Sequence, residues 1–387
     1  VGRDGQLIGP VRAYRDPRHE RGIAGVRQRL PWAQLYDISG IQHMTINTIY
    51  QIAADDPQRL VEGTTFLLMP DLLSYRATGV LGTDITNASS TGMIDVRARQ
   101  WSPFVLDALG VPASAFLPPD EPGSIRGEAL DLRLRGLPLI GVATHDTASA
   151  FAGTPVADRD RALILSLGTW ALIGVEAIGL TPTERSRELN VTHELGVDGT
   201  VRFLRNVSGM WLLEECRRAW ALEDGAEPPV PDLLAAAMAA PAMAAVFDVD
   251  HPSLAAPGQS AESLSAHLVG TTPLSRGAVV RVILESLVAR LAERVAQLEE
   301  LLGTVRPVLH VVGGASRMAP LMQWLADATG KQVVAGPVEA TALGNAAVQW
   351  RTLGAVADLA EARAAIAGMP EIVRYEPIGS RRSWQDF

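Results

Sequence analysis

The stretch VLHVVGGASRMAPLMQWLADATGKQVVAGPVEATALGNAA, from Val308 to Ala347, has the pattern of a nucleotide-binding element. A β-rich apolar run, residues 308–312, meets the turn Gly313-Gly314, and apolar residues then recur at helical spacing up to Gly330. A second short strand is predicted at residues 332–335, and another helix near Thr341. Glycines between a strand and a helix let the backbone approach a ligand, toward which the helix N-terminus directs N–H groups and a positive dipole. The pattern favours binding of a phosphate or adenosine group.

Composition and charge narrow the class of protein. The 387 residues are 47% hydrophobic and 20% charged, which is enough for two globular domains. The net charge is 34 − 43 = −9 without a basic run, so nucleic acid is not an expected partner. Cys216 is the only cysteine, which excludes a disulfide framework. We see no signal peptide or apolar span, and we expect a cytoplasmic protein that does not enter the membrane.

Other nucleotide and hydrolase motifs are not found. The Gly330-Lys331 pair lacks the upstream glycine of a P-loop, His193-Glu194 has no second histidine four residues on, and neither GxSxG nor GxGxxG occurs. Phosphoryl transfer by this chain would therefore need a non-P-loop ATP site.

The pattern of strands suggests two domains. A strand in PLIGVA (138–143) runs into a small-residue helix after Asp146, and a new strand at 162–167 leads through Gly168-Thr169 into another at 171–176. We place the domain boundary between them, near residues 156–161. The amphipathic helix expected at 276–302 would pack on a sheet as scaffold.

Asp146 is the first candidate for chemistry. An aspartate at a strand-to-helix junction commonly caps the helix by accepting backbone N–H groups. The same carboxylate can also accept the proton of a hydroxyl that attacks ATP, and the two roles are compatible. The adjacent His145 is, on local sequence alone, more typical of a structural histidine.

Several segments resemble the FGGY family of carbohydrate kinases, and within it the rhamnulokinase branch. They are LLMPDLLSYRATG (67–79), TDITNASSTGMIDVRARQW (83–101), GVATHDTASA (141–150), SLGTWALIGVE (166–176), LNVTHELGVDGTVRFLRNVSGMWLLEECRRAW (189–220) and the 308–347 stretch. The resemblance implies an α/β fold of two ribonuclease-H-like domains, as in actin-like ATPases, at residues 1–157 (sugar-binding) and 158–387 (nucleotide-binding). It implies transfer of the γ-phosphate of ATP, with Mg²⁺, to the 1-hydroxyl of L-rhamnulose.

The resemblance also assigns roles to single residues. Asp146 falls on the family's proton acceptor, and the sugar-contacting positions fall on His145, Thr147 and Asn206. The nucleotide-contacting positions fall on Gly168, Thr169, Gly314 and Glu214, where Glu214 replaces a common glutamine and lacks its amide donor. No residue is assigned as a metal ligand. Ala315 stands where the family has a third glycine.

The sequence departs from the family pattern at its start. The Asp-x-Gly phosphate motif and a Trp-Gly-Val-Asp segment are not found, so the first domain is expected to lack its N-terminal strands and the chain as given to be weak or inactive. Three alternatives remain open: a kinase of another ketose or deoxy-sugar in the family, a non-catalytic nucleotide-binding remnant, and a structural oligomerisation module. The chain would act as a monomer or a homodimer.

Overall fold

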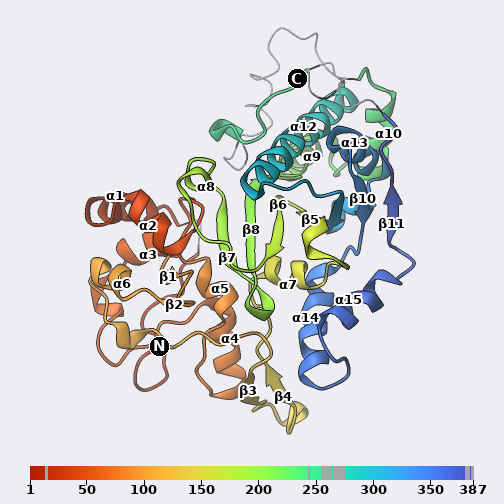
Figure 1. The fold of residues 1–387 in the computed structure, drawn as a ribbon. Helices are drawn as coiled ribbons and strands as arrows, with labels where there is room; N and C mark the ends of the chain where they lie inside the picture. Colours follow the sequence, from red (N-terminus) through yellow and green to blue (C-terminus); the bar gives the residue numbers. More distant parts are fainter. Residues whose placement is uncertain are drawn as a thin grey trace. The chain divides into compact units, whose positions relative to one another are not determined.

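The computed structural model describes residues 1–13, 16–242, 245–254, 258, 264, 275–379 and 384. The chain folds into two compact units that alternate along the sequence (Figure 1). Unit 1 comprises residues 1–153, 175–205 and 341–366, and unit 2 comprises residues 154–174, 206–340 and 367–387. Two strands, β6 (Trp170–Ala177) and β8 (Val201–Ser208), each run from one unit into the other. The domain boundary expected at residues 157/158 stays a prediction.

Unit 2 is built on a sheet around β9 (Val308–Val312). This strand pairs in parallel with β5 (Ala162–Leu167) on one side and with β10 (Gln332–Ala335) on the other. The sheet continues antiparallel from β10 to β11 (Val373–Tyr375) and from β5 to β6. Inner strands of a parallel sheet are covered on both faces, which explains why β5 and β9 are almost continuously apolar in sequence.

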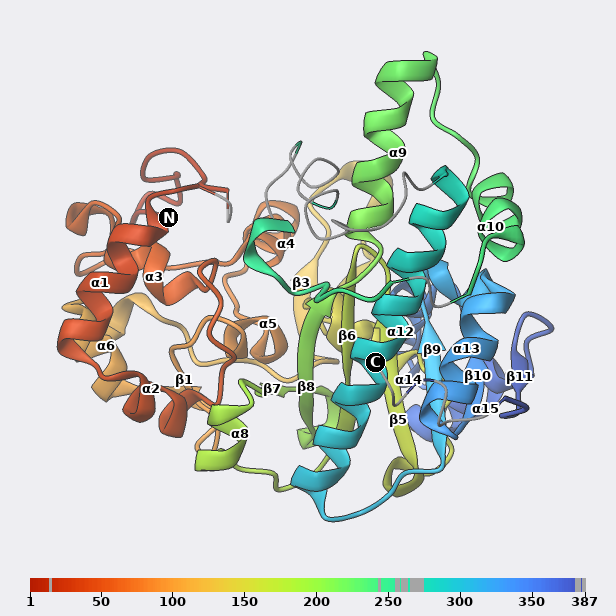
Figure 2. The ribbon, with the colours of Figure 1, turned by 90° about the horizontal axis from the view of Figure 1, so that it is seen from above.

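Three helices of unit 2 pack together beside this sheet. They are α10 (Val230–Ala239), α12 (Arg276–Leu302) and α13 (Ala319–Thr329), and Figures 1 and 2 show them side by side. The side chain of Ser275 caps α12 by accepting the Ala278 N–H, and Gly303 ends the helix in the left-handed conformation. The prediction of an amphipathic helix over 276–302 is confirmed, because the residues of its predicted apolar face, Ile283, Leu287, Leu291, Val295 and Leu298, are buried.

A buried ion pair joins α12 to the turn before β10. Lys331 is only 5% exposed, its Nζ lies 2.5 Å from Glu299 Oε1, and it also donates to the backbone oxygen of Arg306 at 2.7 Å. A buried ammonium group is tolerated when a carboxylate and further hydrogen bonds replace its water. Lys331 therefore fixes the end of α12 against the beginning of the parallel strands.

Unit 1 is mainly helical in its described residues. Its core gathers apolar side chains from short helices and loops, among them Leu35, Ile49, Met93 and Val105. Its helices are α1 (His19–Arg29), α2 (Trp32–Ser39), α3 (Thr48–Ala53), α4 (Met69–Thr78), α5 (Ile85–Ser89), α6 (Pro103–Leu109), α7 (Asp146–Ala152), α8 (Glu184–Glu188), most of α14 (Ala340–Thr352) and of α15 (Leu359–Ala367). Its strands are β1 (Ile94–Asp95) paired with β2 (Gln100–Trp101), β3 (Ile125–Glu128) paired with β4 (Pro138–Ile140), and β7 (Thr192–Leu195) paired with β8.

The elements predicted around the 308–347 stretch are confirmed. Strands β9 and β10 have the expected bounds, and α14 begins at Ala340. Helix α13 starts only at Ala319 because a 3-10 turn, Gly314–Arg317, comes between the glycine turn and the helix. No helix in the described part of the chain is both long and apolar enough to span a membrane.

Candidate active site

The candidate acceptor residues lie at the start of α7, a short helix that the rest of unit 1 holds firmly. Its residues from Thr147 to Ala152 are all buried, and Ser149 Oγ donates to the backbone oxygen of Ala143 at 2.7 Å. Gly344 on α14 approaches so closely that an added Cβ would lie 1.8 Å from the Ser149 oxygen. Small residues on both helices thus permit the contact that fixes α7.

Asp146 is the first residue of α7, and its carboxylate is open to solvent. The side chain is 84% exposed, while Oδ1 accepts the backbone N–H of Thr147 at 2.6 Å and its hydroxyl at 3.2 Å. The helix cap is His145 instead of Asp146, so the capping expectation is off by one residue. One carboxylate oxygen is held by Thr147, and no hydrogen bond within the described residues reaches the other.

His145 lies between two carboxylates of unit 1. Its Nδ1 is 3.7 Å from Asp146 Oδ1 and its Nε2 is 3.9 Å from Glu194 Oε2, distances too long for hydrogen bonds. Burial lowers the pKa of His145 below its ordinary value, the charge of Arg202 adds to this effect, and the neighbouring carboxylates oppose it. The imidazole is therefore neutral near pH 7 and can donate from one nitrogen and accept at the other.

A buried ion pair between Glu194 and Arg202 lies next to His145. The two residues face each other across the β7–β8 ladder, with 2.9 Å between Arg202 Nη2 and Glu194 Oε2. Arg202 is fully buried and Glu194 is 4% exposed. Neither residue was predicted from the sequence. The sequence does contain a signal for this pair. An acidic and a basic residue stand before and after the turn at Val197–Gly199, at positions that oppose each other if the two flanking segments form a hairpin.

Asp84 is a third residue of this region that was not predicted from the sequence. It is 1% exposed and its carboxylate accepts the Asn87 N–H, the Thr86 hydroxyl, and both the N–H and the hydroxyl of Thr144. Burial raises its pKa, and these hydrogen bonds oppose the rise. Asp84 thus caps α5 and holds the backbone just before His145. The signal was an aspartate followed three residues later by a polar residue, the pattern of a helix N-cap.

The candidate nucleotide residues lie in unit 2, where three loops meet. Ser166 of β5 and Val312 of β9 are paired in parallel, so the turns Gly168-Thr169 and Gly313-Gly314 leave the sheet at the same edge. A Cβ on Gly313, whose φ is 94°, would lie 2.7 Å from the Leu167 oxygen. The two turns are therefore in backbone contact, and only glycine fits at position 313.

The third loop joins β8 to α9 (Trp211–Asp224). The N–H groups of Gly209 and Trp211 donate to the Thr169 oxygen, and that of Met210 donates to the Gly168 oxygen. The side chain of Thr169 is exposed beside this junction. Gly314 is also exposed, with open space where its Cβ would be, whereas Ala315 is buried.

The last two sequence-predicted residues are also in unit 2. Asn206 is half-buried on β8, and Glu214 lies in the first turn of α9. Glu214 Oε2 is 2.8 Å from Arg217 Nη1, in an ion pair within the helix. The site residues thus divide between the units, with His145, Asp146 and Thr147 in unit 1 and Gly168, Thr169, Asn206, Glu214 and Gly314 in unit 2.

The described residues include no group of three His, Cys, Asp or Glu side chains that could hold a metal ion by themselves. Mg²⁺ does not need such a group, because in nucleotide sites it binds one or two carboxylates together with phosphate oxygens and water.

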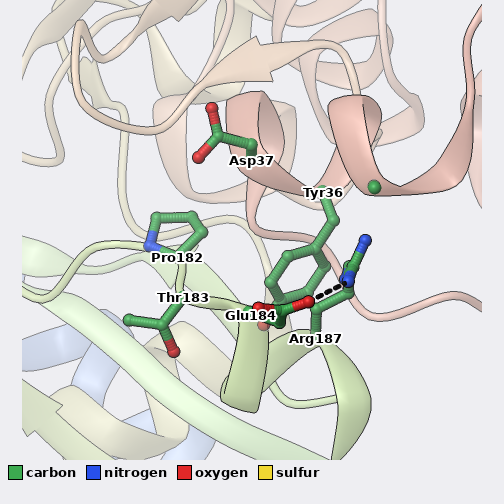
Figure 3. Close-up of a pocket in the computed structure, with 7 residues that line it drawn as sticks. Tyr36, Asp37, Pro182, Thr183, Glu184 and Arg187 are labelled. Atoms are coloured by element: carbon green, nitrogen blue, oxygen red, sulfur yellow. Dashed lines mark hydrogen bonds and ion pairs between the residues drawn. The ribbon is translucent and has the colours of Figure 1, made fainter.

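A pocket of about 210 Å³ lies elsewhere in unit 1, between α2 and α8 (Figure 3). Its charged side chains are already neutralised, since Arg187 Nη2 is 3.2 Å from Glu184 Oε1 and Asp37 pairs with Arg97 outside it. Tyr36 forms one wall and donates to the backbone oxygen of Val191. None of the candidate site residues lines this pocket.

The buried His193, close to this pocket, should make the free energy of unfolding fall at acid pH. The ring is 1% exposed and lies against Tyr36 and Phe203, and burial lowers its pKa to about 4, although backbone oxygens oppose the shift. In the unfolded chain it takes up a proton near pH 6.5. Its contribution to stability is therefore complete above about pH 6.5 and is lost as the pH falls toward 4, in total roughly 3 kcal/mol.

Replacing His193 by glutamine should remove this pH dependence. We expect the free energy of urea unfolding to fall less between pH 7 and pH 4.5 in His193→Gln than in the wild type. The exposed His251 provides the matched variant, His251→Gln, which should keep the wild-type slope. An unchanged slope in His193→Gln would show that its ring titrates normally.

Comparison with known proteins identifies the family. Residues 2–150 match the N-terminal domain of the FGGY family of carbohydrate kinases, and residues 163–353 match its C-terminal domain. A rhamnulokinase of Bacteroides thetaiotaomicron is 35% identical over 97% of this chain and 79% of its own length. A rhamnulokinase of Enterococcus faecalis is 36% identical over 97% of this chain and 78% of its own length.

Solved structures agree in fold. The xylulose kinase of Lactobacillus acidophilus superposes with a TM-score of 0.79 at 17% identity, covering 100% of this chain and 78% of that one. The glycerol kinase of Plasmodium falciparum, solved with ADP, also gives 0.79 at 17% identity, covering 99% and 78%. The expected α/β fold of two actin-like domains is confirmed. The chain belongs to the FGGY family of carbohydrate kinases, the ATP-dependent sugar kinases, and resembles the rhamnulokinases within it.

Proposed function

We propose that the protein transfers the γ-phosphate of ATP to the 1-hydroxyl of L-rhamnulose, in the cytoplasm. The observation that carries the choice of sugar is the identity of 32–37% to rhamnulokinases over nearly the whole chain. The likeness to xylulose, gluconate and glycerol kinases is at 16–20% identity and bears on the fold alone.

In this proposal Asp146 accepts the proton of the sugar hydroxyl. The new bond forms between the sugar oxygen and the γ-phosphorus, the bond from that phosphorus to the β-phosphate oxygen breaks, and ADP leaves. The exposed carboxylate supports this role, because Thr147 holds one oxygen and leaves the other available to a hydroxyl. A neutral His145 suits hydrogen bonding to a sugar, and we assign it to sugar binding with Thr147 and Asn206.

On the nucleotide side we assign phosphate contacts to Gly168, Thr169 and Gly314. Support comes from the shared edge of β5 and β9, where the exposed residues Thr169 and Gly314 lie, and from the backbone contact of the Gly168-Thr169 turn with the N-terminus of α9. Glu214 is assigned near the nucleotide, although its carboxylate already pairs with Arg217. Mg²⁺ bound to the ATP phosphates would neutralise charge that develops during transfer.

A direct assay tests the proposed substrate. ADP release should be measured with ATP and Mg²⁺ in the presence of L-rhamnulose, D-xylulose, L-fuculose, glycerol or gluconate. We expect the highest kcat/KM with L-rhamnulose. A higher kcat/KM with another sugar would contradict the substrate and leave the kinase assignment intact.

The two adjacent glycines allow a matched test of the nucleotide site. Gly314→Ala adds a methyl group in open space, so the melting temperature should hold while ADP affinity falls, because the methyl would meet the phosphates. Gly313→Ala forces a positive φ and a contact with Leu167, so it should lower the melting temperature. Calorimetric titration with ADP and thermal unfolding separate the two effects. Wild-type ADP affinity in Gly314→Ala would remove Gly314 from the site.

A further inference from the structure

Unit 2 contains a cavity of about 250 Å³ that the proposed reaction does not use. Its floor is one face of the sheet, where Val308 and His310 of β9 alternate with residues facing the other way. Gln332 and Val334 of β10 and Ala162 of β5 extend the same face. The loop that precedes β5 forms another wall and includes Asp158 and Arg161.

The pairing of the strands places Arg374 and His310 in one row across the sheet. Arg374 of β11 is paired with Val334, and Val334 is paired with His310 on the other side. Side chains of directly paired residues project from the same face of a sheet. Arg374, Val334 and His310 therefore form one row across the floor of the cavity. The charged Arg374 stands at one end of this row, and His310, which is 7% exposed, is buried at the other.

The two arginines of this cavity differ from most charged residues in unit 2. Within the described residues, neither the Arg161 nor the Arg374 guanidinium has an ion-pair or hydrogen-bond partner. By contrast Arg276, Arg281 and Arg290 each contact a carboxylate. The cavity also holds one carboxylate, Asp158, whose Oδ1 accepts the Asp160 N–H and caps the short 3-10 helix before β5. The lining therefore carries an excess of one positive charge.

This cavity is separate from the nucleotide loops. Ala162 and Val308 are the first residues of β5 and β9, whereas Gly168 and Gly313 follow the last residues of the same strands. A strand rises about 3.3 Å per residue, so strands of five or six residues put roughly 15–20 Å between the cavity and those loops. A nucleotide bound at the loops would leave the cavity accessible.

We propose that this cavity is a second anion site, which binds a small phosphate-bearing molecule through Arg161 and Arg374. Guanidinium groups present parallel N–H donors that match two phosphate oxygens, and charge-assisted bonds of this kind are stronger than neutral ones. The apolar side chains that line the cavity, Val308, Val334 and Ile372, would contact a few carbon atoms next to the phosphate. The volume suits a phosphate group with a short carbon chain and is too small for a nucleotide.

Calorimetric titration of the whole protein tests this site. The probes are inorganic phosphate and glycerol 1-phosphate, each added in the presence of saturating ADP and Mg²⁺ so that the nucleotide loops are occupied. We expect binding of both probes, with glycerol 1-phosphate the tighter. Arg161→Gln and Arg374→Gln should each weaken binding about tenfold or more, because each removes charge-assisted hydrogen bonds.

Two further variants separate the site from general effects of charge. Arg133→Gln makes the same charge change at an arginine that is 86% exposed and paired with Asp131, and it should bind like the wild type. Ala157→Trp places a bulky ring at the exposed rim without changing charge and should also abolish binding. The proposal is overturned if no phosphate heat appears with ADP present, or if affinity is unchanged in the Arg161→Gln and Arg374→Gln variants.

Discussion

Replacing Asp146 by asparagine should reduce kcat about 10²- to 10⁴-fold, the range typical of a lost general base. The amide has the shape of the carboxylate, and its oxygen can still accept the Thr147 N–H, so the start of α7 should be preserved. What disappears is the ability to take the proton from the sugar hydroxyl. We expect the KM for the sugar to change far less than kcat.

The control for Asp146→Asn is its thermal stability. Asp146 is largely exposed, so Asp146→Asn should unfold within a degree or two of the wild type, on the order of the ±0.5 kcal/mol of surface substitutions. Thr147→Val, which removes the hydroxyl but keeps the backbone N–H bond to Oδ1, should give a smaller kcat loss than Asp146→Asn. Wild-type kcat in Asp146→Asn would rule out the assigned role.

Replacing Arg202 by methionine should destabilise the protein by about 3–5 kcal/mol, the usual cost of removing one partner from a buried ion pair. Arg202 is completely buried and Glu194 nearly so, and without the guanidinium the buried carboxylate has no cation to compensate its charge. The loss should appear as a lower midpoint in chemical unfolding, with the slope unchanged.

A double variant distinguishes the ion pair from packing. Glu194→Gln combined with Arg202→Met removes both charges and should be clearly more stable than Arg202→Met alone, since no isolated charge remains buried. If the two changes are simply additive, packing of the arginine stem, and not charge pairing, holds the β7–β8 hairpin. Since His145 lies beside this pair, sugar KM should also rise in the single variant.

The sheet of unit 2 and its long helix could be predicted from sequence because their signals are local. Apolar runs bounded by glycines define β5, β9 and β10, and the 3.6-residue period defines α12. Unit 1 was harder to predict. Its short helices carry few periods each, and its residues 175–205 and 341–366 join it from later in the chain, which depends on contacts between distant segments.

The candidate site divides in the same way. Asp146 and Thr169 stand in recognisable local motifs, whereas Glu194 and Arg202 act through a pairing that only the register of β7 and β8 creates. Asp84 could not be predicted for another reason. Its local pattern indicates only a helix cap, whereas the same carboxylate also accepts a hydrogen bond from Thr144, which lies 60 residues later. Site residues in local motifs can therefore be predicted from a sequence, whereas contacts between side chains from distant segments cannot.

The buried Lys331 also determines how the protein can be labelled. It is the only lysine in the sequence, and its amine is enclosed by Glu299 and a backbone oxygen. Reagents that acylate lysine amines should therefore modify Lys331 slowly in the folded protein, and fast modification of Lys331 itself would report that the end of α12 has opened. Dicarbonyl reagents, which modify arginine, suit its surface better, and protection of Arg161 and Arg374 by phosphate would map the second anion site chemically.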